Sequence, residues 1–273
     1  MDSHRGHAAV CGVGSASAMK RHVLILGGTT EARELAQKLS DRADLAVTIS
    51  LAGRTAVPTP QPVPLRTGGF GGIAGLTQYL AHHKISALID ATHPYATTMS
   101  AHAMTAARET GTPLIVLRRP AWRAMPADRW TEVADARAAA QALGAKPLRV
   151  FLAVGRQEIA PFELAPQHYY LIRSVDPVEP PLALPSADYI QARGPFDQAA
   201  ERALLLHHGI DVLVTKNSGG QAAYGKLAAA RELGVRVLMF QRPLEPAGHA
   251  VDSISDVIAW LNHVPAVRVD RGV

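Results

Sequence analysis

Short apolar runs alternate with helix-like segments along the chain from residue 22 onward. The first run, 22–26, reads HVLIL, and Ala32, Leu35, Ala36 and Leu39 then fall at the i, i+3, i+4 and i+7 positions of one helix face. The same alternation predicts strands at 45–51, 87–91 and 114–117, and helices near 76–80 and at 97–110. Near-continuous apolar strands covered by helices on both faces are typical of a parallel sheet.

A stretch without this alternation, RRPAWRAMPA at 118–127, separates the first series from a second one. The second series predicts strands at 148–154, 169–173, 189–191, 211–215 and 235–240, and helices at 134–143, 199–207, 221–233 and 254–261. The 273 residues are enough for two small domains, since one domain takes about 100–200 residues. We therefore predict an α/β fold of two Rossmann-like domains with mainly parallel sheets and a cleft between them. The expected parts are a disordered N-terminal extension at 1–19, a first domain at 20–118 and a second at 119–265.

Charge and cysteine content narrow the class of ligand. The formal charge of +5 suits an anionic small molecule, while basic residues without long runs and only 5% aromatic residues argue against a nucleic-acid partner. Cys11 is the single cysteine and no Cys/His spacing suits a metal, so the sequence predicts no metal site and a reducing compartment. No apolar run reaches the roughly 18–20 residues that cross a bilayer, which predicts a cytoplasmic protein with no membrane partner.

The first predicted strand runs into a glycine turn and then a helix, the arrangement of a Rossmann phosphate loop. The turn consists of Gly27, Gly28, Thr29, Thr30 and Glu31. Glycine lets the ligand approach the backbone, and the N–H groups that open the helix favour a pyrophosphate. Threonine replaces the usual second glycine, so a plain tight turn with a threonine cap is the alternative.

The second strand and the loop after it bear on which dinucleotide could bind. No acidic residue follows Leu51, whereas Arg54 stands close behind, and a cation there favours the 2′-phosphate of NADP over NAD. A glycine cluster at 67–72, with Gly69 in its middle, would let the backbone approach the cofactor. The alternatives are a solvated loop arginine and a flexible loop end.

Polar residues gather where later strands end, which is where doubly wound sheets bind ligands. Thr92, His93 and Tyr95 follow one strand and stand where a nicotinamide and its substrate would meet, although Pro94 could merely open a helix. After another strand come residues 216–219, a lysine point charge followed by hydrogen-bonding groups at the start of a predicted helix, which together suit an anion. Arginine binds carboxylates bidentately, so these arginines near the strand ends would suit a polycarboxylate substrate: Arg118, Arg119, Arg156, Arg173 and Arg193.

Taken together, seven short motifs resemble the precorrin-6A reductase family of cobalamin biosynthesis. They are LILGGTTEAREL, LAGRT, GGFGG, DATHPYA, RRPAW, AVGRQEI and TKNSGG, and the resemblance runs from about Lys20 to about Asn262. It implies a first domain that binds NADPH and a second that binds the tetrapyrrole precorrin-6A. The implied reaction transfers a hydride to carbon 19 and a proton to carbon 18 of the macrocycle, giving precorrin-6B without a metal.

The resemblance also implies roles for the residues above. The cofactor would contact the turn at 27–31 and, with it, Arg54, Gly69 and Thr92. The catalytic candidates are His93 and Lys216. The substrate would bind Tyr95, Arg118, Arg119, Arg156, Arg173, Arg193, Lys216, Asn217, Ser218 and Gly219. The proline-rich loops at 58–64 and 177–185 would close over the product, and a transient hand-over to the next pathway enzyme could follow.

Three other functions stay open at this level. A cobalt-precorrin-6A reductase would perform the same reaction on the metal-loaded ring and would tend to use NADH. A non-catalytic NADP-binding sensor would share the first domain but would not need a basic cleft. A sugar-nucleotide transferase also has two Rossmann domains but never oxidises NADPH.

Overall fold

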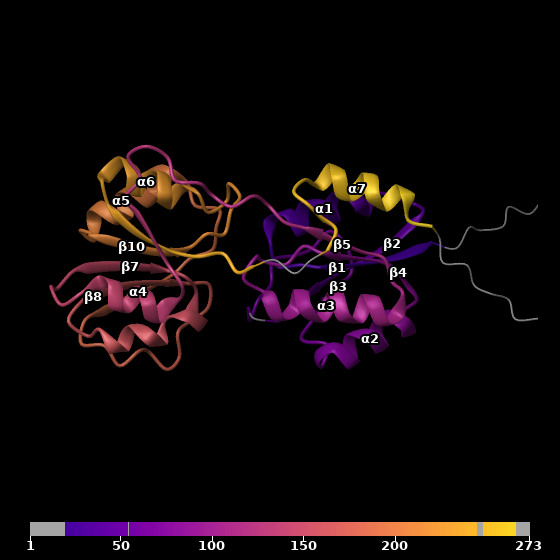
Figure 1. Cartoon of the computed structure of the whole chain (residues 1–273), viewed down its shortest axis with the longest axis horizontal. Coiled ribbons are helices and arrows are strands. Elements are labelled where there is room, and N and C mark those ends of the chain that lie inside the picture. Colours follow the sequence, from indigo (N-terminus) through magenta and orange to yellow (C-terminus); the bar gives the residue numbers. More distant parts are fainter. Residues whose placement is uncertain (1–19, 54, 245–247, 266–273) are drawn as a thin grey trace, which may run out of the picture.

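The computed structural model describes residues 20–53, 55–244 and 248–265, which form two units side by side (Figure 1). Each unit contains a six-stranded sheet, and every strand pair among the described residues is parallel. This confirms the predicted α/β class with two Rossmann-like domains. Residues 1–19, predicted to be a disordered extension, lie outside the described part of the chain.

The first sheet has the strand order β12-β5-β4-β1-β2-β3. Its strands are β1 Arg21–Leu26, β2 Leu45–Leu51, β3 Leu65–Thr67, β4 Ile85–Asp90, β5 Leu114–Leu117 and β12 Ala250–Val251. Helices α1 Thr30–Ser40 and α7 Ile254–His263 cover one face, and α2 Gly72–His82 and α3 Thr97–Thr110 cover the other (Figure 1). Every residue of β4 is buried, as expected for a strand packed on both faces.

The second sheet has the order β6-β11-β10-β7-β8-β9. Its strands are β6 Trp130–Val133, β7 Arg149–Ala153, β8 Tyr169–Ser174, β9 Ala187–Gln191, β10 Val212–Lys216 and β11 Arg236–Phe240. The helices are α4 Ala136–Leu143, α5 Gln198–His207 and α6 Gly225–Leu233, with 3-10 turns η1 Arg156–Glu158 and η2 Ala160–Leu164. Helices α5 and α6 pack on one face, and α4 with η2 packs on the other.

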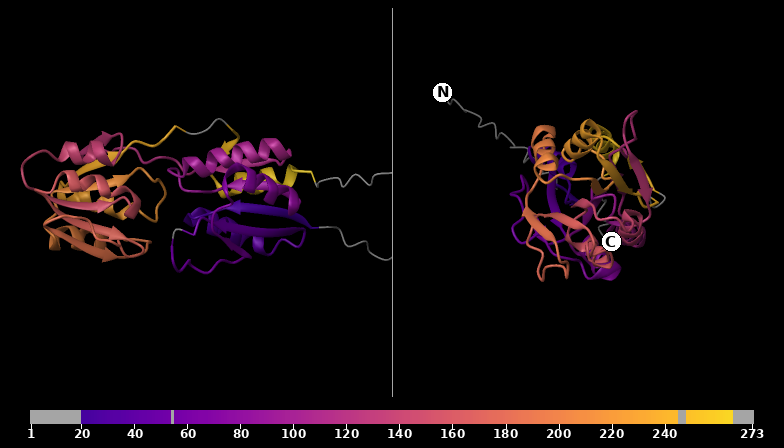
Figure 2. Two further views of the ribbon diagram at one scale, coloured as in Figure 1. Left: turned by 90° about the horizontal axis from the view of Figure 1, so that it is seen from below. Right: turned by 90° about the vertical axis from the view of Figure 1, so that its left-hand side faces the viewer.

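The two sheets exchange their sixth strands. Both follow the doubly wound order 3-2-1-4-5-6, but the strand after β5 along the chain, β6, joins the second sheet. The strand after β11, β12, returns to pair with β5 of the first sheet, so the chain passes between the units twice (Figure 2). The predicted second domain at 119–265 is therefore wrong at its C-terminal end, because β12 and α7 belong to the first unit.

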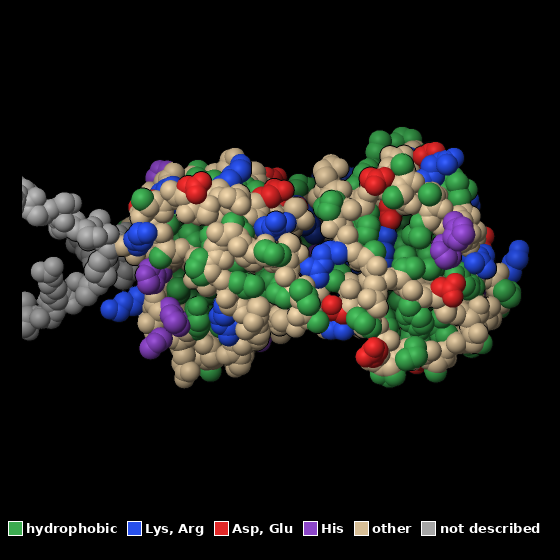
Figure 3. All heavy atoms as spheres, turned by 180° about the vertical axis from the view of Figure 1, so that it is seen from behind, with side chains coloured by type: hydrophobic (Ala, Val, Ile, Leu, Met, Phe, Trp, Pro, Cys, Tyr) green, Lys and Arg blue, Asp and Glu red, His purple; other side chains and the backbone are tan. Residues whose placement is uncertain are grey.

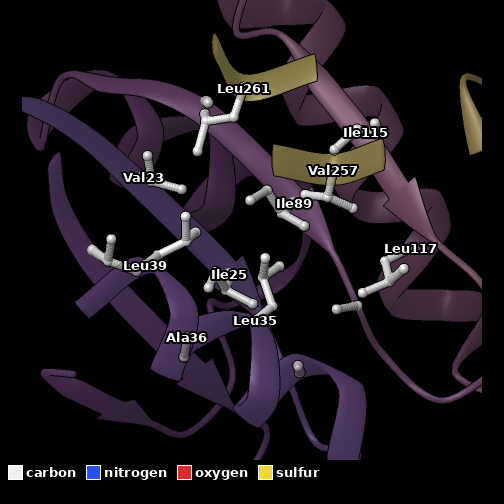
Figure 4. Close-up of a cluster of buried hydrophobic side chains, with 14 of the residues drawn as sticks. Val23, Ile25, Leu35, Ala36, Leu39, Ile89, Ile115, Leu117, Val257 and Leu261 are labelled. Atoms are coloured by element: carbon white, nitrogen blue, oxygen red, sulfur yellow. The ribbon is translucent and has the colours of Figure 1, made fainter. Parts of the chain in front are cut away.

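Helix α7 completes the core of the first unit. Val257 and Leu261 are buried against Ile89 and Ile115 on the sheet and against Leu35 of α1 (Figure 4). Ser253 caps the helix by accepting a hydrogen bond from the backbone N–H of Asp256, so the sequence also fixes where the helix begins. The predicted amphipathic helix at 254–261 is present, but the face it covers lies in the other domain.

The loop after β4 docks the first unit onto the second. The hydroxyl of Tyr95 donates to the carbonyl oxygen of Phe240 (2.6 Å) and accepts from the backbone N–H of Asn217 (2.9 Å). The glycine pair that follows Asn217 lets the units approach closely. A Cβ at Gly219 would collide with the carbonyl oxygen of Pro120, and one at Gly220 would lie 2.8 Å from Oε1 of Glu31.

Removing a side chain of α7 tests this assignment. We expect Leu261→Ala to lower the free energy of unfolding by about 2–5 kcal/mol, because it leaves a cavity in the first core. Hydrogen exchange should then be faster in β4 and β5 than in β7 and β10. Leu206→Ala, at an exposed leucine of α5, is the control and should change stability by less than about 0.5 kcal/mol. Loss of protection confined to the second sheet would contradict the assignment.

Candidate functional site

A cavity of about 810 Å³ lies at the carboxyl ends of strands of the first sheet. We call it the first cavity. It is formed by the turn after β1, the loops after β2, β3 and β4, and the first turns of α3. Its lining consists of Gly27, Gly28, Leu51, Ala52, Gly53, Thr55, Ala56, Pro58, Thr67, Gly68, Thr92, His93, Ala96, Thr98, Met99 and His102. This is the edge at which a doubly wound sheet binds a nucleotide, and the volume is that of a cofactor site.

The turn after β1 has the geometry that the sequence predicts. Gly28 has a φ of +117°, which side chains rarely adopt, and a Cβ at Gly27 would lie 2.9 Å from the side chain of Ile49. Thr29 caps α1 by accepting from the N–H of Ala32, and its hydroxyl donates to the carbonyl oxygen of Ala91 (2.9 Å). The Thr29 side chain therefore fixes the turn, while the first N–H groups of α1 remain the binding groups for an anion.

A second cavity of about 490 Å³ lies between the two units, and we call it the interdomain cavity. The first unit contributes Gly28, Thr29, Thr30, Arg33, Ile49, Leu51, Thr55, Pro58, Thr59, Gln61, His93 and Arg119. The second unit contributes Val175, Arg193, Gly194, Pro195, Phe196, Ser218, Gly219, Ala222 and Ala223. Figure 3 shows the surface narrowing between the units, with Lys or Arg side chains at this waist.

His93 stands where the two cavities meet, because it lines both. Its Nε2 lies 3.0 Å from the Ser218 hydroxyl, and its Nδ1 accepts a hydrogen bond from the backbone N–H of Tyr95 (3.3 Å). Burial lowers the pKa of His93 to about 3, and four neighbouring basic side chains, Arg119 foremost, add to the decrease. The imidazole is therefore neutral at physiological pH, which argues against His93 as the proton donor among the catalytic candidates.

Tyr95 and Lys216 do not line either cavity in the described part of the chain. The Tyr95 hydroxyl, predicted to bind substrate, is used to dock the units, and burial raises its pKa to about 12. The Lys216 ammonium pairs with Oε1 of Glu158 (2.9 Å) and lies 5.3 Å from the centre of the Tyr95 ring. The two side chains thus meet at the contact between the units, Tyr95 from the first unit and Lys216 from the second.

Two of the arginines predicted to bind substrate are buried in the fold. Arg118 donates to the carbonyl oxygen of Thr92 (2.9 Å) and lies 3.5 Å from the buried carboxylate of Asp90. Arg173 forms a bidentate pair with Glu201 at 2.5 and 3.0 Å. Neither lines the first or the interdomain cavity. These ion pairs argue against substrate binding by either arginine, because a buried guanidinium needs a buried anionic partner, and here the protein supplies it.

Two other predicted arginines do line the interdomain cavity. Arg119 donates from Nε to the carbonyl oxygen of Ser218 (2.6 Å) and from Nη1 to Glu31 (2.5 Å), so the acidic residue of the glycine turn is paired there. Arg193 donates to the Thr59 hydroxyl (2.7 Å) and to the carbonyl oxygen of Val57 (2.8 Å). Both arginines therefore join the units across the cavity.

Some of the remaining predicted residues line a cavity, and others contact only protein groups. Thr30, Ser218 and Gly219 line the interdomain cavity, and Thr92 lines the first cavity with its hydroxyl bound to Asp90 (2.6 Å).

The other predicted residues contact protein groups. The amide of Asn217 exchanges two hydrogen bonds with the Trp122 backbone, and the carbonyl oxygen of Gly69 accepts from Arg66 (2.8 Å). Arg156 lies 3.8 Å from Asp176 and lines neither cavity, and Arg54 lies outside the described residues.

The sequence analysis missed one basic residue. Arg33, in the first turns of α1, is exposed and lines the interdomain cavity beside the glycine turn at 27–31. The sequence position of Arg33 could have indicated this location. Arg33 follows Thr30 by three residues and so lies at the same end of the helix as the glycine turn.

Two kinds of feature are absent from the described residues. They contain no group of three His, Cys, Asp or Glu side chains that could hold a metal ion. None of their helices has both the length and the apolar character that crossing a membrane requires.

Comparisons with known proteins identify the family of the chain. The family model described as "Precorrin-6x reductase CbiJ/CobK" matches residues 22–262. A precorrin-6A reductase of Sinorhizobium sp is 53% identical over 90% of this chain and 96% of its own length. A precorrin-6A reductase of Rhodobacter capsulatus is 49% identical over 88% of this chain and 95% of its own. A cobalt-precorrin-6A reductase of Priestia megaterium is 30% identical over 86% and 96%.

A solved structure titled "CobK precorrin-6A reductase" superposes with a TM-score of 0.85 at 46% identity. The superposition covers 93% of this chain and all of that one, so it includes both units and the region between them. Because the family model matches nearly the whole described chain, the chain belongs to the precorrin-6x reductase CbiJ/CobK family.

Proposed function

We propose that this chain reduces precorrin-6A to precorrin-6B with NADPH, in cobalamin biosynthesis. The observation that carries the proposal is the pair of adjoining cavities that share His93, Gly28, Leu51, Thr55 and Pro58. One cavity has the place and size of a dinucleotide site. The other is lined by cations from both units, as a substrate with several carboxylates requires.

The first cavity fits the adenosine and pyrophosphate of a dinucleotide. Gly27 and Gly28 leave room for the phosphates, and the N–H groups that open α1 would bind them. Thr67 and Gly68 on one side and the start of α3 on the other would hold the adenosine. When bound there, NADPH would supply the hydride for carbon 19.

The interdomain cavity provides the charges for the substrate. Arg33, Arg119 and Arg193 line it and would pair with acetate and propionate carboxylates of the macrocycle. Phe196 and Val175 give the same cavity an apolar part for the ring system. The protein's contribution is therefore mainly to orient two large ligands in adjoining cavities.

The second reacting group is the proton for carbon 18. His93 serves as a neutral hydrogen-bonding group, since its imidazole holds no extra proton to give at physiological pH. The remaining candidates for the proton donor are a water bound between the units and Lys216, which lines neither cavity and whose ammonium pairs with Glu158. Hand-over of the product to the next pathway enzyme and a cytoplasmic location stay predictions from the sequence.

The choice of metal-free substrate is supported by the degree of likeness. The relatives named for precorrin-6A are markedly more similar to this chain than the relative named for the cobalt-loaded substrate.

An anaerobically purified enzyme should oxidise NADPH stoichiometrically when precorrin-6A is added, measured by the loss of NADPH absorbance. Cobalt-precorrin-6A is the matched comparison, and faster turnover of it would reverse the assignment. No oxidation with either tetrapyrrole would point to a sensor.

The preference for NADPH is proposed to depend on Arg54, which follows β2 closely in the sequence. We expect Arg54→Ala to raise the KM for NADPH about ten- to a hundredfold, because a charged hydrogen bond contributes roughly 1.5–3 kcal/mol. The KM for NADH should change little. Arg137→Ala, at an exposed arginine of α4, is the control. Equal losses with both cofactors would remove Arg54 from phosphate recognition.

The protonation state of His93 predicts a pH profile. An acid with the ordinary histidine pKa would lose its proton, and the enzyme its activity, as the pH rises through about 6.5. Because the pKa of His93 is lowered to about 3, we expect no such fall between about pH 5 and 8. His93→Gln should keep the shape of the kcat/KM profile. An inflection near pH 6.5 that disappears in this variant would show that His93 titrates during catalysis.

A further inference from the structure

The hydrogen bonds of His93 determine which of its nitrogen atoms carries the proton. The backbone N–H of Tyr95 points to Nδ1, and an amide N–H can only donate, so Nδ1 carries no proton. A neutral imidazole then has its proton on Nε2. Nε2 lies 3.0 Å from the Ser218 oxygen, so the histidine donates and the serine accepts.

Both ends of this contact are held in place. On the first unit, the hydroxyl of Tyr95 is bound to the second sheet, which fixes the loop that carries His93. On the second unit, the carbonyl oxygen of Ser218 accepts from Nε of Arg119 (2.6 Å) and Nη2 of Arg242 (3.2 Å). The serine therefore has a fixed backbone and one committed lone pair.

The proton of the Ser218 hydroxyl is left to donate elsewhere. Within the described residues, no side chain or carbonyl group is placed to accept it, and Ser218 lines the interdomain cavity. A group that must donate into a cavity selects ligands that present an acceptor there. Arg33, Arg119 and Arg193 line the same cavity, which makes an anionic oxygen the matching acceptor.

We propose that Ser218 is a specificity-determining hydrogen-bond donor to a carboxylate of the tetrapyrrole, and that His93 is the positioning residue that directs its proton. This inference rests on the proposed function, since it names how one carboxylate is recognised. It assigns His93 a role that needs neither a charge nor a proton transfer. It also explains why a histidine that lines both cavities is bonded across the two units.

Ser218→Ala tests the donor directly. We expect the dissociation constant of precorrin-6A, from absorbance titration, to rise about ten- to a hundredfold, as for hydrogen bonds to charged groups. The dissociation constant of NADPH, from its fluorescence, should stay within about twofold, and thermal unfolding should match the wild type. Ser186→Ala, at an exposed residue of the second unit, is the matched control.

Two variants at His93 test its positioning role. His93→Gln keeps an N–H donor and should keep most of the affinity for precorrin-6A, whereas His93→Leu should lose about as much as Ser218→Ala. The double variant of Ser218→Ala with His93→Leu should bind precorrin-6A no more weakly than either single variant, because both substitutions remove the same interaction. Additive losses would overturn the pairing.

The possible outcomes separate the inference from the function beneath it. A wild-type enzyme that neither binds nor reduces precorrin-6A would refute the proposed function. An active wild type with an unchanged Ser218→Ala variant would refute only the inference. A rise in the dissociation constant of NADPH instead would place the acceptor on a cofactor phosphate and overturn the assignment to a substrate carboxylate.

Discussion

The contact between the loop after β4 and the carboxyl edge of the second sheet sets the geometry of the whole site. Tyr95 binds the ends of β10 and β11 at once, and His93 in the same loop reaches Ser218. The two sheets thereby present their carboxyl edges to each other at a fixed distance. Gly219 and Gly220 serve this contact as well, because side chains there would separate the units. A reaction between two bound ligands depends on such a separation being held constant.

Much of the fold could be predicted from the periodicity of the sequence. Strands such as β1 and β4 are continuous apolar runs, and α1 carries its apolar face at helical spacing, so local patterns suffice. The missed strands lack a local signal, because β3 and β6 have only three and four residues of mixed polarity and β12 has only two residues. The return of α7 to the first core could not be read either, because an apolar face does not say which sheet will cover it.

The candidate site was predictable in place but less so in its residues. The strand ends mark the edge at which the two cavities lie, and the glycine turn, His93, Arg119, Arg193 and Ser218 line these cavities. The sequence could not distinguish these arginines from Arg118 and Arg173, since that difference lies in distant partners, Asp90 and Glu201. An arginine near a strand end can hold a ligand or a buried carboxylate, and only the tertiary structure decides which.

The exchange of sixth strands bears on how this chain acquires its structure. During synthesis, the sheet that emerges first lacks its outer strand until residues 250–251 have left the ribosome, and its core lacks α7 until later still. Its apolar face over Ile89 and Ile115 stays uncovered while the entire second unit is being made. The first unit is therefore not a contiguous piece of the gene that could be transplanted or lost alone, because its strands come from both sides of the second unit. Duplication of the N-terminal half alone would leave the first sheet without its edge strand, which ties the inheritance of that half to the segment that follows the second unit.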